Sequence, residues 1–222
     1  MRLQSLQIGY IKDYRDFKSA FIKDIYLNYA KVETLGIKEN EIADNKHHGG
    51  INKAIFANSC ENYPIWEKLL NKKLNFGMMG ENLSLQGLHE SNVCVGDIHK
   101  IDNVILQVSE PRKPCIKISL IHHFKGFTQE IFKSGLSGWY YRVLETGELH
   151  TQSKITILER NKENLSILEL NSLFFNPKNT LKQNPNLLTK LANLDTLLAP
   201  NWHECIQKRL NNTYDTSYMQ KL

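Results

Sequence analysis

The spacing of the apolar residues changes once along this chain, close to residue 160. Upstream, short apolar runs such as Val104–Val108 are separated by glycine, Gly-Asp and Asp-Asn turns, which is typical of a sheet of short strands. Downstream, apolar residues recur at the three- and four-residue spacing of a helix, as in the run Ile167–Phe174. The sequence therefore predicts a mainly β domain over residues 1–160 and a helical module over residues 164–212.

The helical module is expected to hold three short amphipathic helices. Ser166 and Glu169 have the spacing of a capping box, in which the hydroxyl caps one free amide and the carboxylate reaches back to another. The first helix should end at Asn176-Pro177, a second should run near residues 185–194, and a third should follow Pro200. A module this small must bury its apolar faces against its own helices, the β domain or another chain. We expect it to close the edge of a pocket or to support contact with a partner, with a stabilising cap as the alternative.

Within the β domain, the pattern predicts few helices. Residues 62–73 are expected to form a helix, with a proline in its first turn and apolar residues on one face. A shorter helix is expected over Phe127–Phe132. Further along, Gly138–Leu144 and Lys154–Leu158 are predicted to be two strands, with Gly147 in the turn between them.

Composition and charge exclude several classes of protein. The chain has 222 residues, of which 41% are hydrophobic, so it can bury a large core. No apolar run approaches the ~20 residues of a membrane-spanning helix. The first residues carry neither the apolar stretch nor the cleavage site of a signal peptide, so we expect a cytoplasmic protein without membrane association. The net charge of +5 comes from scattered cations, which allow an anionic ligand but indicate no direct binding of nucleic acid.

Cysteine usage agrees with a reducing compartment. The four cysteines, at positions 60, 94, 115 and 205, contain no C-x-x-C pair and do not resemble a disulfide framework. Cys115 differs from the others because it lies in the loop Ser109–Lys117, where two prolines stiffen the backbone and three cations lie within three residues. Positive charge favours the thiolate, which is the form that attacks electrophiles and binds soft metals. The alternative is that Cys115 fills a gap in the core.

Two further clusters contain residues suited to a ligand. Lys46-His47-His48-Gly49-Gly50 combines side-chain donors with paired glycines, whose amides can face an anion. A strand would turn the adjacent histidines to opposite faces, so His47 and His48 are not expected to share a metal, and no zinc motif is present. Gly80-Glu81-Asn82-Leu83-Ser84 offers a carboxylate and a bidentate amide. Taken alone, the first is explained by a surface turn and the second by a solvated or capping glutamate.

Taken together, these segments and their order resemble the molybdenum cofactor sulfurase C-terminal (MOSC) domain family, and within it the YiiM-type bacterial proteins. The motifs that carry this resemblance are, in chain order, His48-Gly49-Gly50, Gly80-Glu81-Asn82-Leu83, Gly96-Asp97-Ile98, Gln107-Val108-Ser109-x-Pro111-Arg112-x-Pro114-Cys115-x-Lys117 and Gly138-Trp139-Tyr140. The tail resembles the three-helix module of that group in Ser166–Asn171, Phe175–Asn179 and Trp202-x6-Arg209-Leu210. The resemblance thus covers nearly the whole chain.

The resemblance implies a β-barrel-like domain that binds the molybdenum cofactor (molybdopterin), in which a pterin carries the metal. It implies that Cys115 is both the catalytic residue and the protein's ligand to molybdenum, and a soft thiolate suits such a metal. Lysine, arginine and glycine amides suit a phosphorylated pterin. The residues expected to bind the cofactor are Lys23, His47, Gly49, Gly50, Asn82 and Arg112.

Two turns depart from the family pattern. Relatives have Gly-Asp where this chain has Glu39-Asn40, and again, before the last strand of the barrel, where this chain has Gln152-Ser153. Both positions are predicted to be turns, so we expect altered loops rather than lost chemistry.

The function implied by the resemblance is a molybdenum-dependent oxidoreductase that reduces N-hydroxylated compounds to amines. Its substrates would include hydroxylaminopurine-type base analogues such as 6-hydroxylaminopurine, and the reaction would serve detoxification. The implied partners are the small N-hydroxylated substrate and a separate electron-donor reductase, and a homodimer is left open. The alternative is a carrier of sulfur or of the molybdenum cofactor that uses Cys115, although the sequence contains no pyridoxal-type sulfurase domain. A third alternative is a non-catalytic module that binds a protein partner through its terminal helices.

Overall fold

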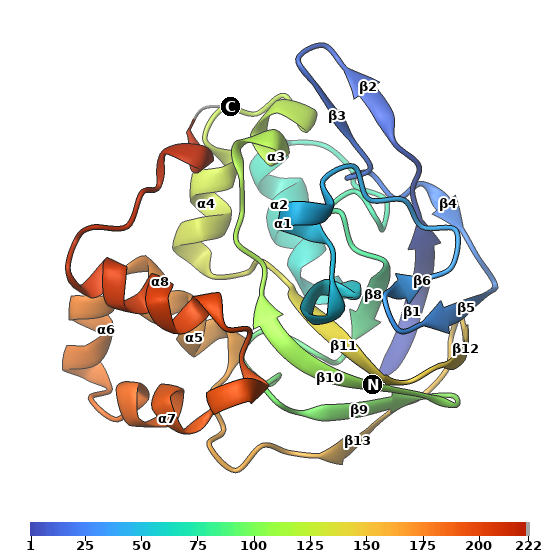
Figure 1. The fold of residues 1–222 in the computed structure, drawn as a ribbon. Helices are drawn as coiled ribbons and strands as arrows, with labels where there is room; N and C mark the ends of the chain where they lie inside the picture. The colour runs from blue at the N-terminus through green and yellow to red at the C-terminus, as the bar shows by residue number, and fades with distance from the viewer. Residues whose placement is uncertain (221–222) are drawn as a thin grey trace.

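A curled sheet of eight strands forms the body of the protein in a computed structural model that describes residues 1–220, apart from the side chain of Lys46 (Figure 1). The strand order across the sheet is β13-β9-β10-β11-β7-β8-β1-β4, and neighbouring strands are antiparallel except β7 and β8, which are parallel. The strands are β1 (Arg2–Ile8), β4 (Ile25–Tyr26), β7 (Ile55–Ser59), β8 (Leu83–Gln86), β9 (Ile98–Ile101), β10 (Val104–Pro111), β11 (Trp139–Glu145) and β13 (Ile155–Glu159).

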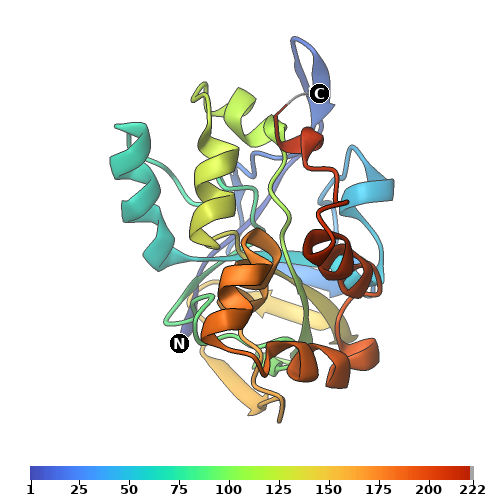
Figure 2. The ribbon, with the colours of Figure 1, turned by 90° about the vertical axis from the view of Figure 1, so that its left-hand side faces the viewer.

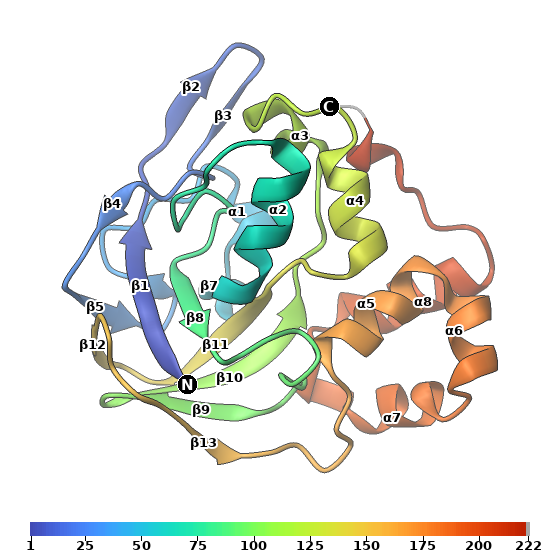
Figure 3. The ribbon, with the colours of Figure 1, turned by 180° about the vertical axis from the view of Figure 1, so that it is seen from behind.

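The sheet curls until its two sides meet near the N-terminus. Leu3 N donates to Ser153 O over 2.9 Å, and Ile155 N donates to Met1 O over 3.1 Å. The start of β13 therefore runs beside the start of β1, as Figure 3 shows from behind. This nearly closed sheet, with several helices around it, confirms the predicted mainly β, barrel-like fold.

Two smaller sheets extend the barrel. They are a three-stranded sheet of β12 (Gly147–His150), β5 (Tyr29–Glu33) and β6 (Gly36–Ile37), and a hairpin of β2 (Lys12–Tyr14) and β3 (Phe17–Ser19). The hairpin projects from the body of the protein (Figure 1). The prediction that Gly147 lies in a turn is wrong, because Gly147 begins β12 and pairs with Val32 of β5. That pairing depends on a strand more than a hundred residues away, which the local pattern does not reveal.

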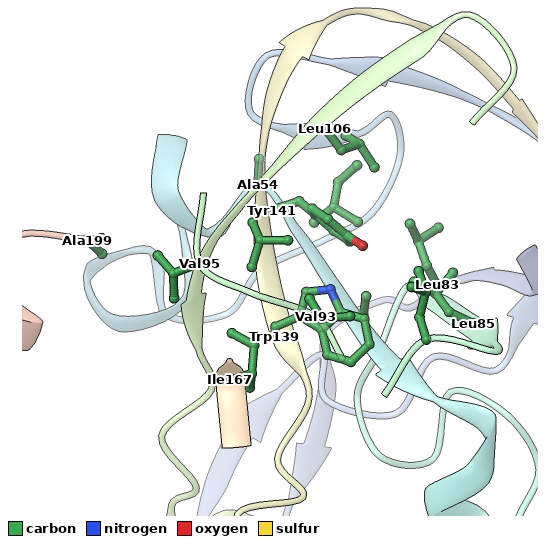
Figure 4. Packing of buried hydrophobic residues seen from close by; sticks show 14 of the residues in the cluster. Ala54, Leu83, Leu85, Val93, Val95, Leu106, Trp139, Tyr141, Ile167 and Ala199 are labelled. Atoms are coloured by element: carbon green, nitrogen blue, oxygen red, sulfur yellow. The ribbon is translucent and has the colours of Figure 1, made fainter. Parts of the chain in front are cut away.

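Apolar side chains fill the interior of the barrel. In β10, the inward residues Val104, Leu106 and Val108 are fully buried, as the two-residue period of a strand requires. Figure 4 shows this packing, with Trp139 and Tyr141 of β11 in the same cluster.

Helices α2, α3 and α4 pack together at one end of the barrel around a second buried cluster that includes Trp66, Ile118 and Phe127. α2 and α4 confirm the helices predicted from the sequence. The helices of this region, with the short α1 and two 3-10 turns, are α1 (Asn45–His48), η1 (Ile51–Lys53), η2 (Cys60–Asn62), α2 (Tyr63–Leu70), α3 (Ile116–Ile121) and α4 (Phe127–Ser134).

The tail contains four α-helices rather than the predicted three. They are α5 (Ile167–Phe175), α6 (Pro177–Gln183), α7 (Leu187–Asn193) and α8 (Asn201–Leu210), followed by η4 (Ser217–Met219), with η3 (Asp195–Leu197) before α8. The predicted capping box is confirmed, since Ser166 Oγ accepts from Glu169 N over 3.1 Å and Glu169 Oε2 accepts from Ser166 N over 2.9 Å. Pro177 follows the end of α5 as predicted, but it also begins α6, where its missing N–H is not needed.

The tail shares its core with the barrel. Leu170, Phe174 and Leu191 belong to the same buried cluster as the barrel residues. In Figure 4, Ile167 and Ala199 of the tail belong to the cluster that fills the barrel. Figure 2 shows the tail helices, in orange and red, lying against one side of the protein.

Both turns that depart from the family pattern have left-handed backbone conformations. Glu39 has φ 70° and Gln152 has φ 71°, in a region that glycine adopts most easily. The prediction of turns at these positions is confirmed, and the chain accepts a side chain where glycine would be unstrained. Among residues 1–220, no helix is both long enough and apolar enough to span a bilayer.

Candidate functional site

A cleft opens at the end of the barrel where α3 begins, and Cys115 lies in its wall. It holds about 710 Å³ of atom-free space, a volume that includes open solvent at its mouth. Its walls come from segments remote in sequence: β3 and the chain after it, the segment before α1, β7, the residues before β8 and the loop from β10 to α3. We call it the Cys115 cleft.

Cys115 ends the loop between β10 and α3. Its thiol is free and the residue is half-buried, immediately before the first turn of α3. The backbone is fixed on both sides, because Arg112 N donates to Gly138 O over 3.2 Å and Thr128 Oγ1 donates to Cys115 O over 2.9 Å. The predicted loop Ser109–Lys117 is confirmed only for residues 112–115. Glu110 and Pro111 still pair with β11 at the end of β10, and Ile116 and Lys117 begin α3.

The other cysteines lie in different settings. Burial raises the pKa of Cys60 to about 12, with Glu61 adding to the effect, and burial raises the pKa of Cys94 to about 11. Cys205 is buried in α8 and accepts a hydrogen bond from Lys113 Nζ over 3.0 Å. None of these three residues lines the Cys115 cleft.

Arg112 is the most buried cation of the cleft, with 5% of its surface exposed. Its guanidinium lies between two rings, 4.9 Å from the centroid of Phe21 and 5.0 Å from that of Phe56. Nη1 donates to Met79 O over 3.1 Å, and within residues 1–220 no carboxylate forms an ion pair with this side chain. A buried cation without a counter-charge is costly, so this arrangement favours an anionic ligand in the cleft.

Gly80 explains how one of these rings fits. A Cβ atom at Gly80 would lie 2.7 Å from the ring of Phe21, and its φ of 94° also suits glycine. The glycine of the Gly80-Glu81-Asn82 motif therefore makes room for the aromatic wall over Arg112.

Lys23 is the second buried cation of the cleft, with 6% of its surface exposed. Its Nζ donates to Asn40 Oδ1 over 2.8 Å and to Glu41 O over 3.4 Å. Burial lowers the pKa of Lys23 to about 8, although the charge of Glu41 acts in the opposite direction. Asn40 is one of the residues at which the chain departs from the family pattern, and here it orients the lysine.

The two histidines of the His-His-Gly-Gly segment point in different directions, but for a different reason from the one predicted. The segment is helix α1 rather than a strand, so neighbouring side chains differ by about 100° around its axis. The ring of His47 is exposed and its Nδ1 lies 2.9 Å from Asp44 Oδ2. His48 lines the cleft instead, and its pKa is lowered to about 4 by burial and by the charges of Arg112 and Lys53.

Gly49 and Gly50 lie outside the lining of the cleft. Gly50 has φ 93°, and a Cβ there would contact nothing within 4 Å, so this glycine serves the turn into η1 and is not needed for a close approach. Of the residues predicted from the sequence, the structure therefore brings together Cys115, Lys23, Asn82 and Arg112. It places His47, Gly49 and Gly50 beside the cleft but not in its wall.

The neighbouring residues Asn82 and Glu81 have different surroundings: Asn82 lines the cleft, and Glu81 is buried outside it. Asn82 lines the cleft and is held by the barrel, since its Nδ2 donates to Gln7 O over 3.2 Å and its Oδ1 accepts from Phe56 N over 3.4 Å. Glu81 is fully buried and accepts from Gly77 N over 2.8 Å, and burial raises its pKa. The expectation of a solvated or capping glutamate is therefore wrong, and Glu81 has a structural role away from the cleft.

Sequence reasoning missed the aromatic wall and one cation, Lys18, which lines the cleft from β3. Tyr140 lies in the Gly138-Trp139-Tyr140 motif and Phe21 lies two residues before Lys23, but neither carried a signal of its own. Phe56 gave no signal because an aromatic residue in a strand is ordinary core. Lys53, whose Nζ donates to His47 O over 2.6 Å, lines the cleft from η1.

The donor set of the cleft fits a metal that arrives within an anionic organic cofactor. Five lysine or arginine side chains line it, Lys18, Lys23, Lys53, Arg112 and Lys117, against the carboxylates of Glu41 and Asp44. Residues 1–220 contain no group of three or more His, Cys, Asp or Glu side chains that could hold a bare metal ion. A single thiolate among cations can instead complete the coordination of a metal whose other ligands come with the cofactor.

Comparison with known proteins agrees with this geometry. The family model of the MOSC domain matches residues 44–156. Protein YflK of Bacillus subtilis is 32% identical over 167 residues, which cover 75% of this chain and 73% of that protein. Protein YiiM of Escherichia coli is 28% identical over 205 residues, which cover 90% of this chain and 89% of that protein.

Two further similarities bear on fold and activity. The crystal structure of YiiM from Geobacillus stearothermophilus has a TM-score of 0.74 at 28% identity and covers 94% of this chain and 98% of its own. A protein named "Reductase" from Gibberella moniliformis is 36% identical over 127 residues, or 55% of this chain. This chain spans only 23% of that fungal protein.

Proposed function

This chain belongs to the MOSC domain family and, within it, to the YiiM type, and from this premise we propose that it is a molybdenum-cofactor-dependent reductase. Its substrates would be N-hydroxylated compounds, including hydroxylaminopurine-type base analogues, which it would convert to amines.

The observation that carries the proposal is a free thiol in the same cleft as a buried cation that has no acidic partner among the described residues. Cys115, whose thiol is free, lines a cleft in which the guanidinium of Arg112 lies about 5 Å from the centroids of two rings. Such a cation contributes little to the stability of the empty protein, but it would form charge-assisted hydrogen bonds with a phosphate. The thiol and the cation together match a phosphorylated cofactor that carries a thiophilic metal.

Within this proposal, each residue has a definite task. Cys115 is the protein's ligand to the metal, and Arg112, Lys23 and Asn82 bind the anionic pterin. From the α1 segment, His48 is the residue that faces the cleft. A role of His47, Gly49 and Gly50 in binding the cofactor stays a prediction; these residues belong to the same segment as His48.

When bound, the cofactor supplies the two-electron chemistry that the side chains of the protein cannot perform. Reduction of an N-hydroxyl group to an amine and water takes up two electrons and two protons. Lys23 Nζ lies in the cleft wall and can hold or release a proton near neutral pH, because burial lowers its pKa to about 8. The rings of Phe21 and Phe56 shield the guanidinium of Arg112 from water and thereby strengthen its interaction with an anion.

The name of the fungal relative supports a reductase, although this chain matches only part of that protein. We propose that the electrons come from a separate reductase, as the family resemblance implies. The competing function, a carrier of sulfur or of the cofactor, would use the same thiol and is distinguished by experiment.

The test is to purify the protein from a host that makes the molybdenum cofactor and to measure molybdenum and pterin per chain. Reduction of 6-hydroxylaminopurine is then assayed with a chemically reduced viologen as electron donor. We expect close to one molybdenum per chain and formation of the amine, both lost in Cys115→Ala. A cyanide-labile sulfur without molybdenum would support the carrier. A Cys115→Ala protein with full molybdenum and activity would refute the assignment.

A further inference from the structure

The tail contacts the end of β10 and the loop that follows it through residues spaced three apart; we call this segment, residues 109–117, the Cys115 loop. The contacts are Ala199 N to Ser109 O at 3.2 Å, Trp202 Nε1 to Glu110 Oε2 at 2.6 Å, and Lys113 Nζ to Cys205 Sγ at 3.0 Å. Residues at this spacing lie on one face of a helix, so α8 and the residues before it present a single face to the loop. Helix α4 holds the same loop at Cys115 itself, through the hydrogen bond from Thr128 Oγ1 to Cys115 O.

Trp202 is the central residue of this face. It is fully buried, and its ring lies 4.5 Å from Lys113 Nζ while its indole N–H donates to Glu110. One side chain of the tail therefore fixes two loop residues, one on each side of Arg112. Losing this hydrogen bond should be costly, because Glu110 has only 2% of its surface exposed and a buried carboxylate needs a hydrogen-bond donor.

Glu110 connects this contact to the cleft. Its other oxygen, Oε1, lies 3.9 Å from Lys53 Nζ, and Lys53 lines the Cys115 cleft. The carboxylate thus stands between a cation of the cleft and a tryptophan of the tail. A substitution of Trp202 can therefore alter the cleft in two ways. It can shift Glu110 and with it Lys53, or it can shift the loop residues that lead to Cys115.

We propose that Trp202 is a positioning residue, which holds Glu110 and Lys113 in place and so sets where Cys115 presents its thiol. The importance given to Cys115 rests on the proposed function. The contacts themselves, and the first test of them, do not depend on a bound cofactor.

The first test compares Trp202→Phe with Tyr141→Phe in the cofactor-free protein. Trp202→Phe keeps an aromatic ring but removes the donor to Glu110. Tyr141→Phe is the control, because it also loses one buried hydrogen bond, the one between the Tyr141 hydroxyl and His99 Nδ1 at 2.8 Å, and this bond joins β11 to β9. Amide hydrogen exchange is followed over residues 109–117, and alkylation of Cys115 by iodoacetamide is followed by peptide mass spectrometry, so that the other three cysteines do not interfere.

For Trp202→Phe we expect exchange in residues 109–117 to become about tenfold faster and alkylation of Cys115 to accelerate, since a hydrogen bond to a charged group is lost. Tyr141→Phe should change neither. Glu110→Gln retains an acceptor for the indole and should keep the loop protected, whereas Glu110→Ala should resemble Trp202→Phe. Equal effects of Trp202→Phe and Tyr141→Phe on the loop, or no effect of either, would overturn the proposal.

A second measurement uses the cofactor-loaded protein. If Trp202 positions the thiol, Trp202→Phe should lower kcat more than it raises KM, and Tyr141→Phe should leave both unchanged at a temperature where it is folded. Should no variant, including the wild type, reduce an N-hydroxylated substrate, the proposed function fails while the exchange and alkylation results still decide the role of Trp202. A loop that loosens without any change in kcat would contradict the positioning role.

Discussion

The guanidinium of Arg112 lies over the ring of Phe56, 5.0 Å from its centroid, in the wall of the Cys115 cleft. This cation is almost fully buried, and no carboxylate forms an ion pair with it anywhere in the described chain. Stacking and one hydrogen bond to a carbonyl offset only part of the cost of burying it. The residue is therefore better suited to binding an anion than to stabilising the fold.

Replacing Arg112 by methionine should separate binding from stability. Arg112→Met retains an apolar side chain between the two rings, so we expect the free energy of unfolding of the cofactor-free protein to be unchanged or to rise. Cofactor occupancy should fall, because loss of a charge-assisted contact costs about 1.5–3 kcal/mol, or roughly ten- to a hundredfold in affinity. Pterin content per chain and urea unfolding measure the two effects.

The matched control is Arg209→Met. Arg209 also stacks near two rings, Phe132 and Phe174, but it donates to the last carbonyls of α5, including Phe174 O at 2.7 Å. This variant should lose stability and keep its cofactor affinity. Unchanged pterin content in Arg112→Met would assign Arg112 to substrate binding or to the surface of the cleft.

Cys115→Ala should remove molybdenum and leave the fold intact. Cys115 is half-buried, and its thiol forms no hydrogen bond within residues 1–220, so the free energy of unfolding should change by less than about 1 kcal/mol. Cys60→Ala and Cys94→Ala are the controls, and both should retain molybdenum because these residues lie outside the cleft. Metal analysis of the three purified proteins is the measurement, and loss of metal from either control would show that Cys115 is not the sole thiol involved.

Local sequence signals predicted much of the fold. The capping box at Ser166 and the strand β10 follow from hydrogen-bonding capacity and from a two-residue period, and both are confirmed. Helix α6 was missed because Pro177 was interpreted only as a stop, although a proline also fits the first turn of a helix. Strand β12 was missed because its partner is β5, and that pairing is a tertiary property.

The candidate site was predictable to the extent that its residues carry their own chemistry. Cys115 and Arg112 stand in a loop rich in proline and cations, which gives a signal in the sequence. The ring of Phe56 could not be assigned to the site from the sequence, because only the folded position of β7 brings it beside Arg112. The sequence does not show which face of α1 lies toward the cleft, and His47 was chosen over His48. Neighbouring side chains of a helix differ by about 100° around its axis, so only one of the two histidines can face the cleft.

Stability should decrease as the pH falls from about 6.5 to about 4, in part through His99. This ring is fully buried, and burial lowers its pKa to about 4 although Asp97 acts in the opposite direction. The unfolded chain, with an ordinary histidine pKa near 6.5, therefore binds a proton before the folded chain does. Stability is complete above about pH 6.5 and is lost as the pH approaches 4, by up to about 3 kcal/mol from this residue.

Urea unfolding between pH 7 and pH 4 tests this prediction. His99→Gln should show a shallower dependence on pH than the wild type, by about one proton, even if it is less stable at pH 7. His203→Gln, a change on the tail helix α8, serves as the control and should retain the slope of the wild type. An unchanged slope in His99→Gln would mean that another group governs the acid sensitivity.

Glu39→Gly should stabilise the protein by about 1 kcal/mol, because Glu39 has φ 70° and a left-handed conformation is unfavourable for a residue with a Cβ atom. The gain is reduced by the greater freedom of glycine in the unfolded chain. Lys38→Gly is the matched control at the neighbouring exposed position, which has no positive φ, and it should lose stability. Thermal unfolding measures both, and a loss of stability in Glu39→Gly would show that the turn is not strained.

Deleting residues 164–222 should abolish folding of the barrel rather than release a functional domain. The buried cluster is continuous across the boundary, so the deletion would expose barrel residues such as Val93 and Val95 that pack in the same core as Ile167. Leu170→Ala tests the same continuity with a single change, and it should cost about 2–5 kcal/mol while unfolding remains one cooperative transition. Soluble expression, near-UV circular dichroism and urea unfolding are the measurements.

A soluble fragment 1–163 that binds molybdenum but fails with its physiological reductase would instead show that the tail serves an electron-donor partner. A fragment as active as the full chain with every donor would exclude both roles.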